Sequence, residues 1–234
     1  MLPEGPLVAD ESYYTHARPE VLRLVPSDVR QVVDVGCAAG ALGASIKQTF
    51  PDTEVRGIEI VAEQALRAKQ VLDDAVAMGA DDPMPAHWPA PDCVIFADVL
   101  EHLVDPWSVL RLWRQRVQPG AWLIVSLPNV THVSIAADLL QGRWKYADEG
   151  LLDRTHLRFF SRPGALELIE QADFRVESLG RSPLVPDFLP ARKTIEGWAT
   201  RATVREAAKP VGSLTRTLLD LLTFEFLITA RAKP

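Results

Sequence analysis

The chain has 234 residues, enough for one sizeable α/β domain or for one domain with a modest appendage. Hydrophobic residues make up 47% and charged residues 24%, which is the balance of a soluble globular protein. The formal net charge of -6 leaves no excess of Lys and Arg to displace phosphate counterions, so we expect no general nucleic-acid binder.

Short β-branched runs alternate with helical patterns over the first half of the chain, which is typical of parallel βαβ units. We predict strands at residues 31–35, 54–60, 74–78, 92–97 and 121–127. Helices are expected from the first glycine-containing loop through about Phe50, across residues 62–72, and across residues 106–117.

The alternation breaks at residues 128–162, which are rich in His, Arg, Trp and Tyr and have weak periodicity. A helix at 163–172 and a strand at 174–179 resume it. Residues 181–222 are predicted as a proline-containing loop and one or two helices before a last strand at 223–232. We therefore predict a single domain over residues 1–234, with about seven strands and an insertion after the fifth.

The end of the first strand is the default ligand site, because ligands of open α/β sheets bind where parallel strands end. The chain there reads Asp34-Val35-Gly36-Cys37-Ala38-Ala39-Gly40. Gly36 and Gly40 permit a sharp turn and close backbone approach, and the following helix begins with free N–H groups. An ordinary tight turn would use the same glycines. The spacing is not the GxGxxG of a dinucleotide site, which disfavours a nicotinamide oxidoreductase.

Glu59 ends the second strand about 20 residues further on, where a carboxylate can accept hydrogen bonds from two ribose hydroxyls. A glutamate at a strand end is often only solvated. Its combination with the glycine-containing loop favours a ribose-containing ligand.

Several segments resemble the motifs of class I S-adenosylmethionine-dependent methyltransferases. VVDVGCAAG resembles their glycine-rich first motif and GIEI their second, while ADVLEHL, DPW and PGAWLIVSLPN resemble their fourth and fifth segments, in the same order and spacing. The resemblance runs from about residue 13 to residue 230. It implies a Rossmann-like seven-stranded mixed sheet of order 3-2-1-4-5-7-6, with the last strand antiparallel and helices on both faces.

The resemblance also implies that S-adenosylmethionine lies across the ends of the first four strands and leaves as S-adenosylhomocysteine. The methionine portion would contact Asp34, Gly36 and Gly40, and the ribose would contact Glu59, so that the amides of residues 36–40 and this carboxylate cup the adenosyl group. Residues 1–28 would cover the cofactor. The full cofactor set implied is Tyr14, Arg18, Asp34, Gly36, Cys37, Ala38, Gly40, Glu59, Ile60, Asp81, Asp98 and Val99.

The chain departs from the family pattern at two places. Where the family often has Gly-Asp after the third strand, this chain has Gly79-Ala80-Asp81-Asp82, so either aspartate is a candidate adenine contact. Ala38-Ala39 replaces the usual Gly-Thr or Gly-Ser, which we expect to be tolerated if the φ angles there are negative. Arg18 is a candidate partner of the methionine carboxylate or a plain surface arginine.

Methyl transfer from a sulfonium mainly requires alignment of the acceptor and exclusion of water. A hydroxyl acceptor must also lose a proton, which suits a histidine with a pKa near 6.5. His156 is the favoured base and His102 the second candidate. His102 could instead cap a helix or, with Asp98 and Glu101, match the acidic-x-x-Glu-His run proposed to bind a divalent ion in some quinone O-methyltransferases.

We call residues 128–162 the lid, because they are predicted to cover the substrate after the fifth strand. The lid resembles a bacterial subgroup associated with polysaccharide and glycan biosynthesis. Aromatic rings stack on sugar faces and ionised groups fix orientation, so we predict O-methylation of a sugar or glycan-related small molecule. The candidate acceptor-binding residues are Asn129, Tyr146, Arg154 and Arg158. A lid held together by salt bridges is the structural alternative.

Other functions remain open at this point. The acceptor could be an amine or carbon of a natural product, or a quinone-like phenol, and a non-catalytic binding protein could keep the fold. A homodimer is compatible with the sequence. Cys37 and Cys93 form no CxxC pair, the first twenty residues lack a secretion-signal pattern, and about 18 uncharged apolar residues never occur together. These features predict a cytoplasmic protein without a membrane span.

Overall fold

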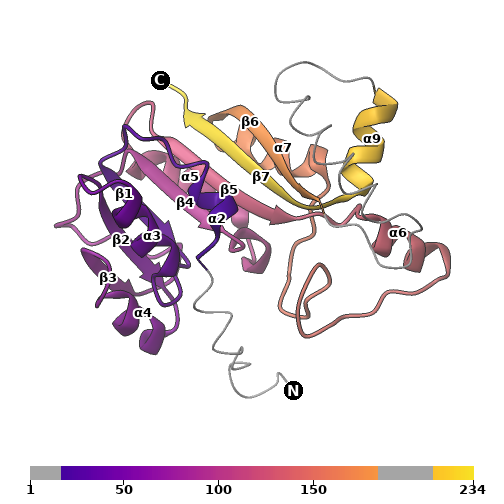
Figure 1. Ribbon diagram of the computed structural model, residues 1–234, viewed down its shortest axis with the longest axis horizontal. Helices are drawn as coiled ribbons and strands as arrows, with labels where there is room; N and C mark the ends of the chain where they lie inside the picture. Colours follow the sequence, from indigo (N-terminus) through magenta and orange to yellow (C-terminus); the bar gives the residue numbers. More distant parts are fainter. Residues whose placement is uncertain (1–16, 184–212) are drawn as a thin grey trace. The chain divides into compact units, whose positions relative to one another are not determined.

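The computed structural model describes residues 17–183 and 213–234, which fall into two compact units, Met1–Pro89 and Ala90–Pro234 (Figure 1). The seven strands follow the order β3-β2-β1-β4-β5-β7-β6, which confirms the predicted order. Tyr14 and residues 184–212 of the predicted 181–222 segment lie outside the described residues. None of the helices in the described part combines the length and hydrophobicity that crossing a bilayer requires.

The described part of the first unit contains three parallel strands and three helices. They are α2 (Pro19–Leu22), β1 (Gln31–Val35), α3 (Ala41–Thr49), β2 (Glu54–Glu59), α4 (Ala62–Ala68) and β3 (Asp74–Ala77). All residues of β1 except the first are buried, because the strands of a parallel sheet are covered on both faces. Both β1 and β2 end in the loops that were predicted to hold a ligand.

The second unit contains the other four strands. Its elements are β4 (Cys93–Ala97), η1 (Leu100–His102), α5 (Pro106–Arg116), β5 (Trp122–Pro128), α6 (Val133–Leu140), α7 (Arg162–Gln171), β6 (Phe174–Pro183), α9 (Ser213–Leu221) and β7 (Thr223–Ala232). β7 is antiparallel to both β5 and β6, as predicted for the last strand. Phe96 and Trp113 pack edge to face in the core at a centroid distance of 5.9 Å.

Two elements, α4 and β6, differ clearly in length from the prediction, and one helix was not predicted. α4 ends at Ala68, whereas the sequence pattern predicted a helix to residue 72. β6 extends to Pro183 because it pairs along the whole of the long strand β7. The lid contains α6, a helix that the weak periodicity did not predict, and the His132 side chain caps it by accepting from the Ser134 amide.

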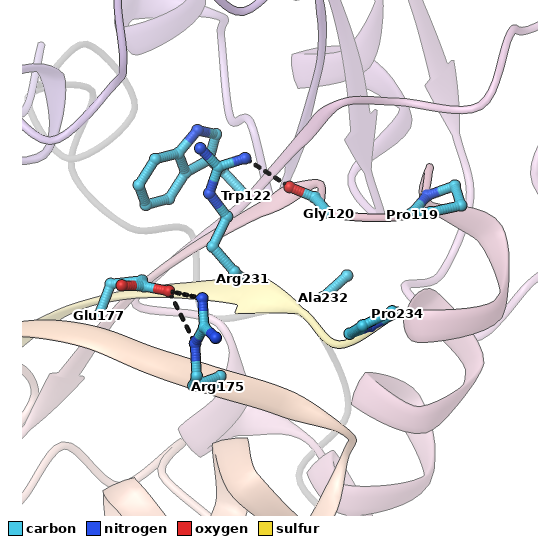
Figure 2. Close-up of a pocket in the computed structure, with 8 residues that line it drawn as sticks. All are labelled: Pro119, Gly120, Trp122, Arg175, Glu177, Arg231, Ala232 and Pro234. Atoms are coloured by element: carbon cyan, nitrogen blue, oxygen red, sulfur yellow. Dashed lines mark hydrogen bonds and ion pairs between the residues drawn. The ribbon is translucent and has the colours of Figure 1, made fainter.

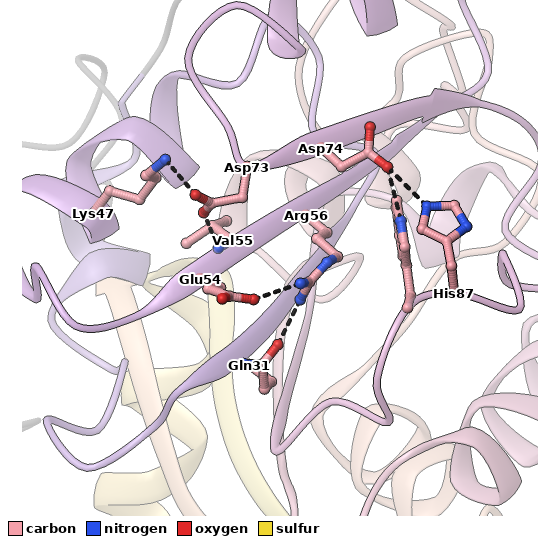
Figure 3. A network of polar contacts seen from close by, with 9 residues as sticks. Gln31, Lys47, Glu54, Val55, Arg56, Asp73, Asp74 and His87 are labelled. Carbon is pink, nitrogen blue, oxygen red and sulfur yellow. Dashed lines mark hydrogen bonds and ion pairs between the residues drawn. The ribbon is translucent and has the colours of Figure 1, made fainter.

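Polar contacts tie the first unit together near the start of β3 (Figure 3). The Asp74 carboxylate accepts from Trp88 Nε1 at 2.9 Å, lies 3.3 Å from His87 Nε2, and pairs with Lys69 at 3.1 Å. Burial raises the pKa of Asp74, but the hydrogen bonds from Trp88, Lys69 and His87 outweigh it and lower that pKa to about 2. Asp74 therefore stabilises the folded unit when it is ionised.

Asp74→Asn should lower the free energy of unfolding at pH 7 by about 1–2 kcal/mol, as expected for lost hydrogen bonds to a charged group. Because the folded pKa is depressed, this stabilisation is present above pH 3.8 and is lost as pH falls through about 2. Urea unfolding at pH 7 and pH 2.5 measures the difference between variant and parent. The exposed Asp52→Asn change is the control, and a difference that stays constant with pH would contradict this linkage.

Candidate functional site

The loop after β1 is a tight turn whose amides bond within the protein. Gly36 and Gly40 adopt φ values of +76° and +86°, which side chains disfavour. The amides of Gly36 and Cys37 both donate to the Ile58 carbonyl, at 2.7 and 3.0 Å, and the Gly40 amide donates to the Cys37 carbonyl at 2.8 Å. The prediction that the amides of residues 36–40 face the ligand is therefore wrong for these three, which serve to shape the loop.

Gly40 also lets the loop pack closely against α4. A Cβ at this position would lie 2.8 Å from Val71 Cγ2 and 3.1 Å from the Ala68 Cα, closer than packed atoms can approach. The loop and α4 are thus held at a separation that only glycine permits.

Ala38 has a φ of +49°, so the condition of a negative φ, under which this alanine was expected to be tolerated, is not met. The left-handed region costs a residue with a Cβ about 1–2 kcal/mol. The Ala38 amide donates to Glu59 Oε2 at 2.9 Å, and this bond holds the strained residue in place. Strained backbone of this kind is commonly found at ligand sites.

Glu59 is fixed by two backbone amides. Oε2 accepts from Ala38 and Oε1 accepts from the Val61 amide, also at 2.9 Å. The side chain is only 7% exposed. Since each carboxylate oxygen has two lone pairs, both oxygens keep acceptor capacity for hydroxyl groups.

Asp34 lies beside Glu59 and is 2% exposed. Burial and the nearby Glu59 carboxylate raise the pKa of Asp34 to about 7, and Arg18 acts in the opposite direction. Arg18 also forms an ion pair with Glu20 at 2.5 Å, at the start of α2. Two neighbouring buried carboxylates repel each other, so this part of the first unit favours a cation.

The remaining residues predicted around the cofactor differ in exposure. Cys37 packs against β2, since a Cβ on Gly57 would lie 2.4 Å from its sulfur, and burial raises the pKa of its thiol. Its side chain is therefore an unreactive packing group. Ile60 is 78% exposed, next to the fixed Glu59. Asp81 is exposed, whereas Asp82 accepts from the Gly79 amide at 2.7 Å and closes the turn after β3.

In the second unit, Asp98 follows β4 with a φ of +54°. Its amide donates to Ser126 Oγ at 2.9 Å, and that hydroxyl donates to Asp98 Oδ1 at 2.8 Å. Ser126 thereby fixes both the backbone and the carboxylate of Asp98, while Val99 leads into η1. The sequence analysis missed Ser126, although its hydroxyl interrupts an otherwise apolar strand.

The two candidate bases, His102 and His156, lie together, with ring centroids 4.8 Å apart. His156 Nδ1 lies 3.3 Å from the Leu151 carbonyl, which can only accept. This contact assigns the proton to Nδ1 and leaves Nε2 with a free lone pair. Burial and the neighbouring His102 lower the pKa of His156, so the ring is neutral near pH 7.

Thr155 and Asp153 position His102. The Thr155 hydroxyl and amide both donate to Asp153 Oδ1, at 2.6 and 2.7 Å. His102 Nδ1 lies 3.1 Å from that hydroxyl and 3.3 Å from the Thr155 carbonyl, so it is the donor and its Nε2 is also an acceptor. Sequence analysis did not assign Asp153 and Thr155, although Asp-x-Thr is a typical sequence for such a side-chain turn.

The lid is anchored at the histidine pair. The amides of Leu157 and Arg158 both donate to the Glu101 carbonyl, at 2.8 and 3.0 Å. The buried Glu101 side chain offers one ligand atom within 4.8 Å of a nitrogen of each histidine. In the described part of the chain, the residues that lie close enough together to hold a metal ion are thus Glu101, His102 and His156. The predicted ligand Asp98 is not among them.

The four residues that were predicted to bind the methyl acceptor differ in burial and in hydrogen-bond partners. Asn129 is fully buried, donates both amide hydrogens to the carbonyls of Asp220 and Thr223, and accepts from the Thr131 amide and hydroxyl. These bonds use the hydrogen-bonding capacity of the Asn129 side chain. The prediction that Asn129 binds the methyl acceptor is therefore wrong, and this residue has a structural role.

The other three predicted residues lie further along the lid. Arg154 pairs with Asp148 at 2.8 Å, and Arg158 donates to the carbonyls of Leu157 and Val104. Both arginines therefore brace the lid, as in the structural alternative. Tyr146 is 53% exposed and remains accessible to a ligand.

A surface hollow of about 500 Å³ lies elsewhere in the second unit, where β5 begins and β7 ends (Figure 2). The Arg231 guanidinium stacks on Trp122 at 3.8 Å and donates to the Gly120 carbonyl at 2.6 Å. Arg175 pairs with Glu177 at 2.7 Å. These mutual contacts indicate a structural role, and the amino end of a parallel strand is opposite the end that binds ligands.

Asp34→Asn should stabilise the ligand-free protein at alkaline pH. With its pKa raised to about 7, the contribution of Asp34 to stability is intact below pH 3.8 and is lost as pH rises through about 7. The gain of the variant over the parent should therefore grow by about 2 kcal/mol from pH 5 to pH 8, since one proton corresponds to about 1.4 kcal/mol per pH unit. Urea unfolding at both pH values measures it, and an equal gain at each would refute the raised pKa.

The family described as "Methyltransferase domain" matches residues 10–179. A ubiquinone biosynthesis O-methyltransferase of Chromobacterium violaceum is 34% identical over 107 residues, which cover 43% of this chain and 45% of the relative. A trans-aconitate 2-methyltransferase of Azoarcus sp. is 34% identical over 124 residues, which cover 52% and 47%. The chain thus spans about half the length of the curated relatives it matches.

Solved structures agree in fold. An S-adenosylmethionine-dependent methyltransferase of Thermotoga maritima has a TM-score of 0.62 at 16% identity, covering 94% of this chain and 89% of its own. The plantazolicin methyltransferase BpumL, in complex with S-adenosylhomocysteine, has a TM-score of 0.58 at 12% identity, covering 95% and 84%. The chain therefore belongs to the methyltransferase domain family and has the fold of S-adenosylmethionine-dependent methyltransferases of known structure.

Proposed function

We propose that the protein transfers the methyl group of S-adenosylmethionine to a hydroxyl oxygen of a sugar or glycan-related acceptor, with His156 as the general base. The observation that carries this proposal is a neutral imidazole whose Nε2 is available, because Nδ1 is committed to the Leu151 carbonyl. Such a group removes a proton from a hydroxyl near neutral pH.

The first unit supplies the proposed cofactor contacts. The Glu59 carboxylate, held by two amides, accepts from the ribose hydroxyls. Asp34 faces the positively charged methionine portion, which compensates for the repulsion between the two buried carboxylates. Ile60, which is exposed beside Glu59, covers the adenine. In the second unit, we retain Asp98 and Val99 as contacts of the methionine side.

The reaction needs one base. The acceptor hydroxyl gives its proton to His156 Nε2 while its oxygen forms a bond to the methyl carbon. The bond from that carbon to sulfur breaks, and its electron pair remains on sulfur, which gives S-adenosylhomocysteine. His102, held by Thr155, stands beside His156 and orients its ring.

The lid supports a sugar-type acceptor through its composition. Aromatic side chains and ionised groups alternate between residues 143 and 160, which suits a ring with an apolar face and several hydroxyls. The names of the relatives suggest other acceptors, a ubiquinone precursor and trans-aconitate. A phenol of the first kind is the second candidate, because the Glu101–His102 pair is also compatible with a divalent ion that would bind a phenolate.

Glu59→Gln should weaken binding of S-adenosylhomocysteine about 10- to 100-fold, since charged hydrogen bonds to the ribose are lost. Isothermal titration calorimetry measures the dissociation constant. Glu63→Gln is the matched control, because Glu63 is an exposed acid in α4 of the same unit. Equal affinity of the Glu59 variant and the parent would exclude the ribose role.

His156→Ala should lower kcat by about 100-fold or more and leave the affinity for S-adenosylhomocysteine within about twofold. The parent's kcat should rise with pH up to a value below 6.5 and then stay level, because the base works when neutral and its pKa is lowered. The kcat of the variant should not show this rise with pH. Methyl transfer is measured with labelled cofactor against saccharides, dihydroxyphenols and carboxylic acids, and transfer to phenols alone would overturn the sugar acceptor.

Dialysis against a chelator separates the base from the metal hypothesis. If His156 acts as a base, the parent should keep its activity after dialysis. Loss of activity that Mg²⁺ or Zn²⁺ restores would instead assign Glu101, His102 and His156 to a metal ion.

A further inference from the structure

Three aromatic side chains of the lid form a continuous row that begins beside His156 of the histidine pair. Phe159 lies next to His156, with ring centroids 6.3 Å apart. Trp144 packs edge to face on Phe159 at 5.4 Å, and Tyr146 lies 6.3 Å from Trp144 and 6.5 Å from Phe159. The three rings therefore contact one another, and Phe159 connects them to the proposed base His156.

The backbone holds this row in place. The Ala147 amide donates to the Leu152 carbonyl at 2.9 Å, and the Arg154 amide donates to the Ala147 carbonyl at 3.0 Å. The Arg154–Asp148 ion pair spans the same turn. Residues 143–147 are thus tied to the stretch that leads into His156, so the aromatic rings and the base belong to one braced segment.

These rings are more accessible than core packing requires. Trp144 is 38% exposed and Tyr146 is 53% exposed, and every residue from 141 to 150 is exposed. Large aromatic side chains that are partly exposed, clustered and close to a reactive group are typical of ligand sites. A purely structural cluster would bury both rings.

The surrounding charges indicate what kind of ligand fits. Exposed Arg143 and Lys145 alternate with Trp144 and Tyr146, and exposed Asp148 and Glu149 follow at once. Arg143 pairs with Asp138 at 2.5 Å and Asp148 pairs with Arg154 at 2.8 Å, so this segment carries charges of both signs without an excess of either. Such a segment does not suit a polyanion, and its exposed polar side chains do not suit a long alkyl chain. They suit a ligand with apolar ring faces and many hydroxyl groups, because both signs of charge form hydrogen bonds with hydroxyls.

We propose that Trp144, Tyr146 and Phe159 form a second acceptor subsite, which binds a sugar ring adjacent to the one that is methylated. This inference rests on the proposed function and narrows its acceptor to an oligosaccharide or the end of a glycan. Phe159 contacts both His156 and Trp144, so a second sugar ring would contact Trp144 while the first lies at the base.

The test compares acceptors of one and several rings. For any sugar that the parent methylates, kcat/KM should be higher for its disaccharide and trisaccharide than for its methyl glycoside. Trp144→Ala should raise KM for the oligosaccharides about five- to tenfold, with kcat within about twofold and the methyl glycoside unaffected. Trp144→Phe should restore most of the affinity, because it keeps a ring for stacking.

Leu140→Ala is the matched control, because Leu140 is a 90% exposed apolar residue of the same lid outside the aromatic row, and its kinetics should equal those of the parent. A Trp144→Ala variant that loses thermal stability and activity equally on all acceptors would overturn the subsite and assign the row to packing. Sugar methylation without dependence on length would also overturn it while leaving the proposed function intact. If no saccharide is methylated, the proposed function fails, and the subsite with it.

Discussion

The cofactor side of this protein depends on one carboxylate that bonds two backbone amides. Glu59 accepts from Ala38 in the loop after β1 and from Val61 before α4, so a single side chain links the ends of two neighbouring strands. Gly36 and Cys37 add bonds to the Ile58 carbonyl beside it. The loop is rigid before any ligand binds, and preorganisation of this kind lowers the entropy lost on binding.

Two features next to Glu59 lower the stability of the folded first unit. Asp34 is buried next to Glu59, and Ala38 adopts a left-handed conformation that residues with a Cβ avoid. Asp98 in the second unit has a positive φ as well, and Ser126 holds it there. Strain and buried charge concentrated near the predicted cofactor contacts are expected where a cationic ligand provides compensating interactions.

The acceptor side depends on backbone contacts of the lid with η1. The Glu101 carbonyl accepts two amides of the lid, which brings His156 against His102 although 54 residues separate them in the chain. Carbonyl groups then fix the proton on Nδ1 of both rings. Two imidazoles with available Nε2 atoms and a buried carboxylate are suited to proton transfer, and their arrangement depends on the folded lid.

The order of the sheet followed from the resemblance to class I methyltransferases. Local patterns were sufficient for the strands and for the tight turn after β1, because burial on both faces and tight turns leave direct marks in composition. They did not predict α6, which depends on the His132 cap, nor the structural role of Asn129, whose partners lie more than 90 residues away. Positive φ at Ala38 and the tautomer of His102 were likewise decided by hydrogen bonds to groups that are distant in the sequence. The sequence thus determined which strands exist and which loops the family resemblance assigns to the cofactor, whereas tertiary contacts decided which polar groups remain available, since only folding specifies their partners.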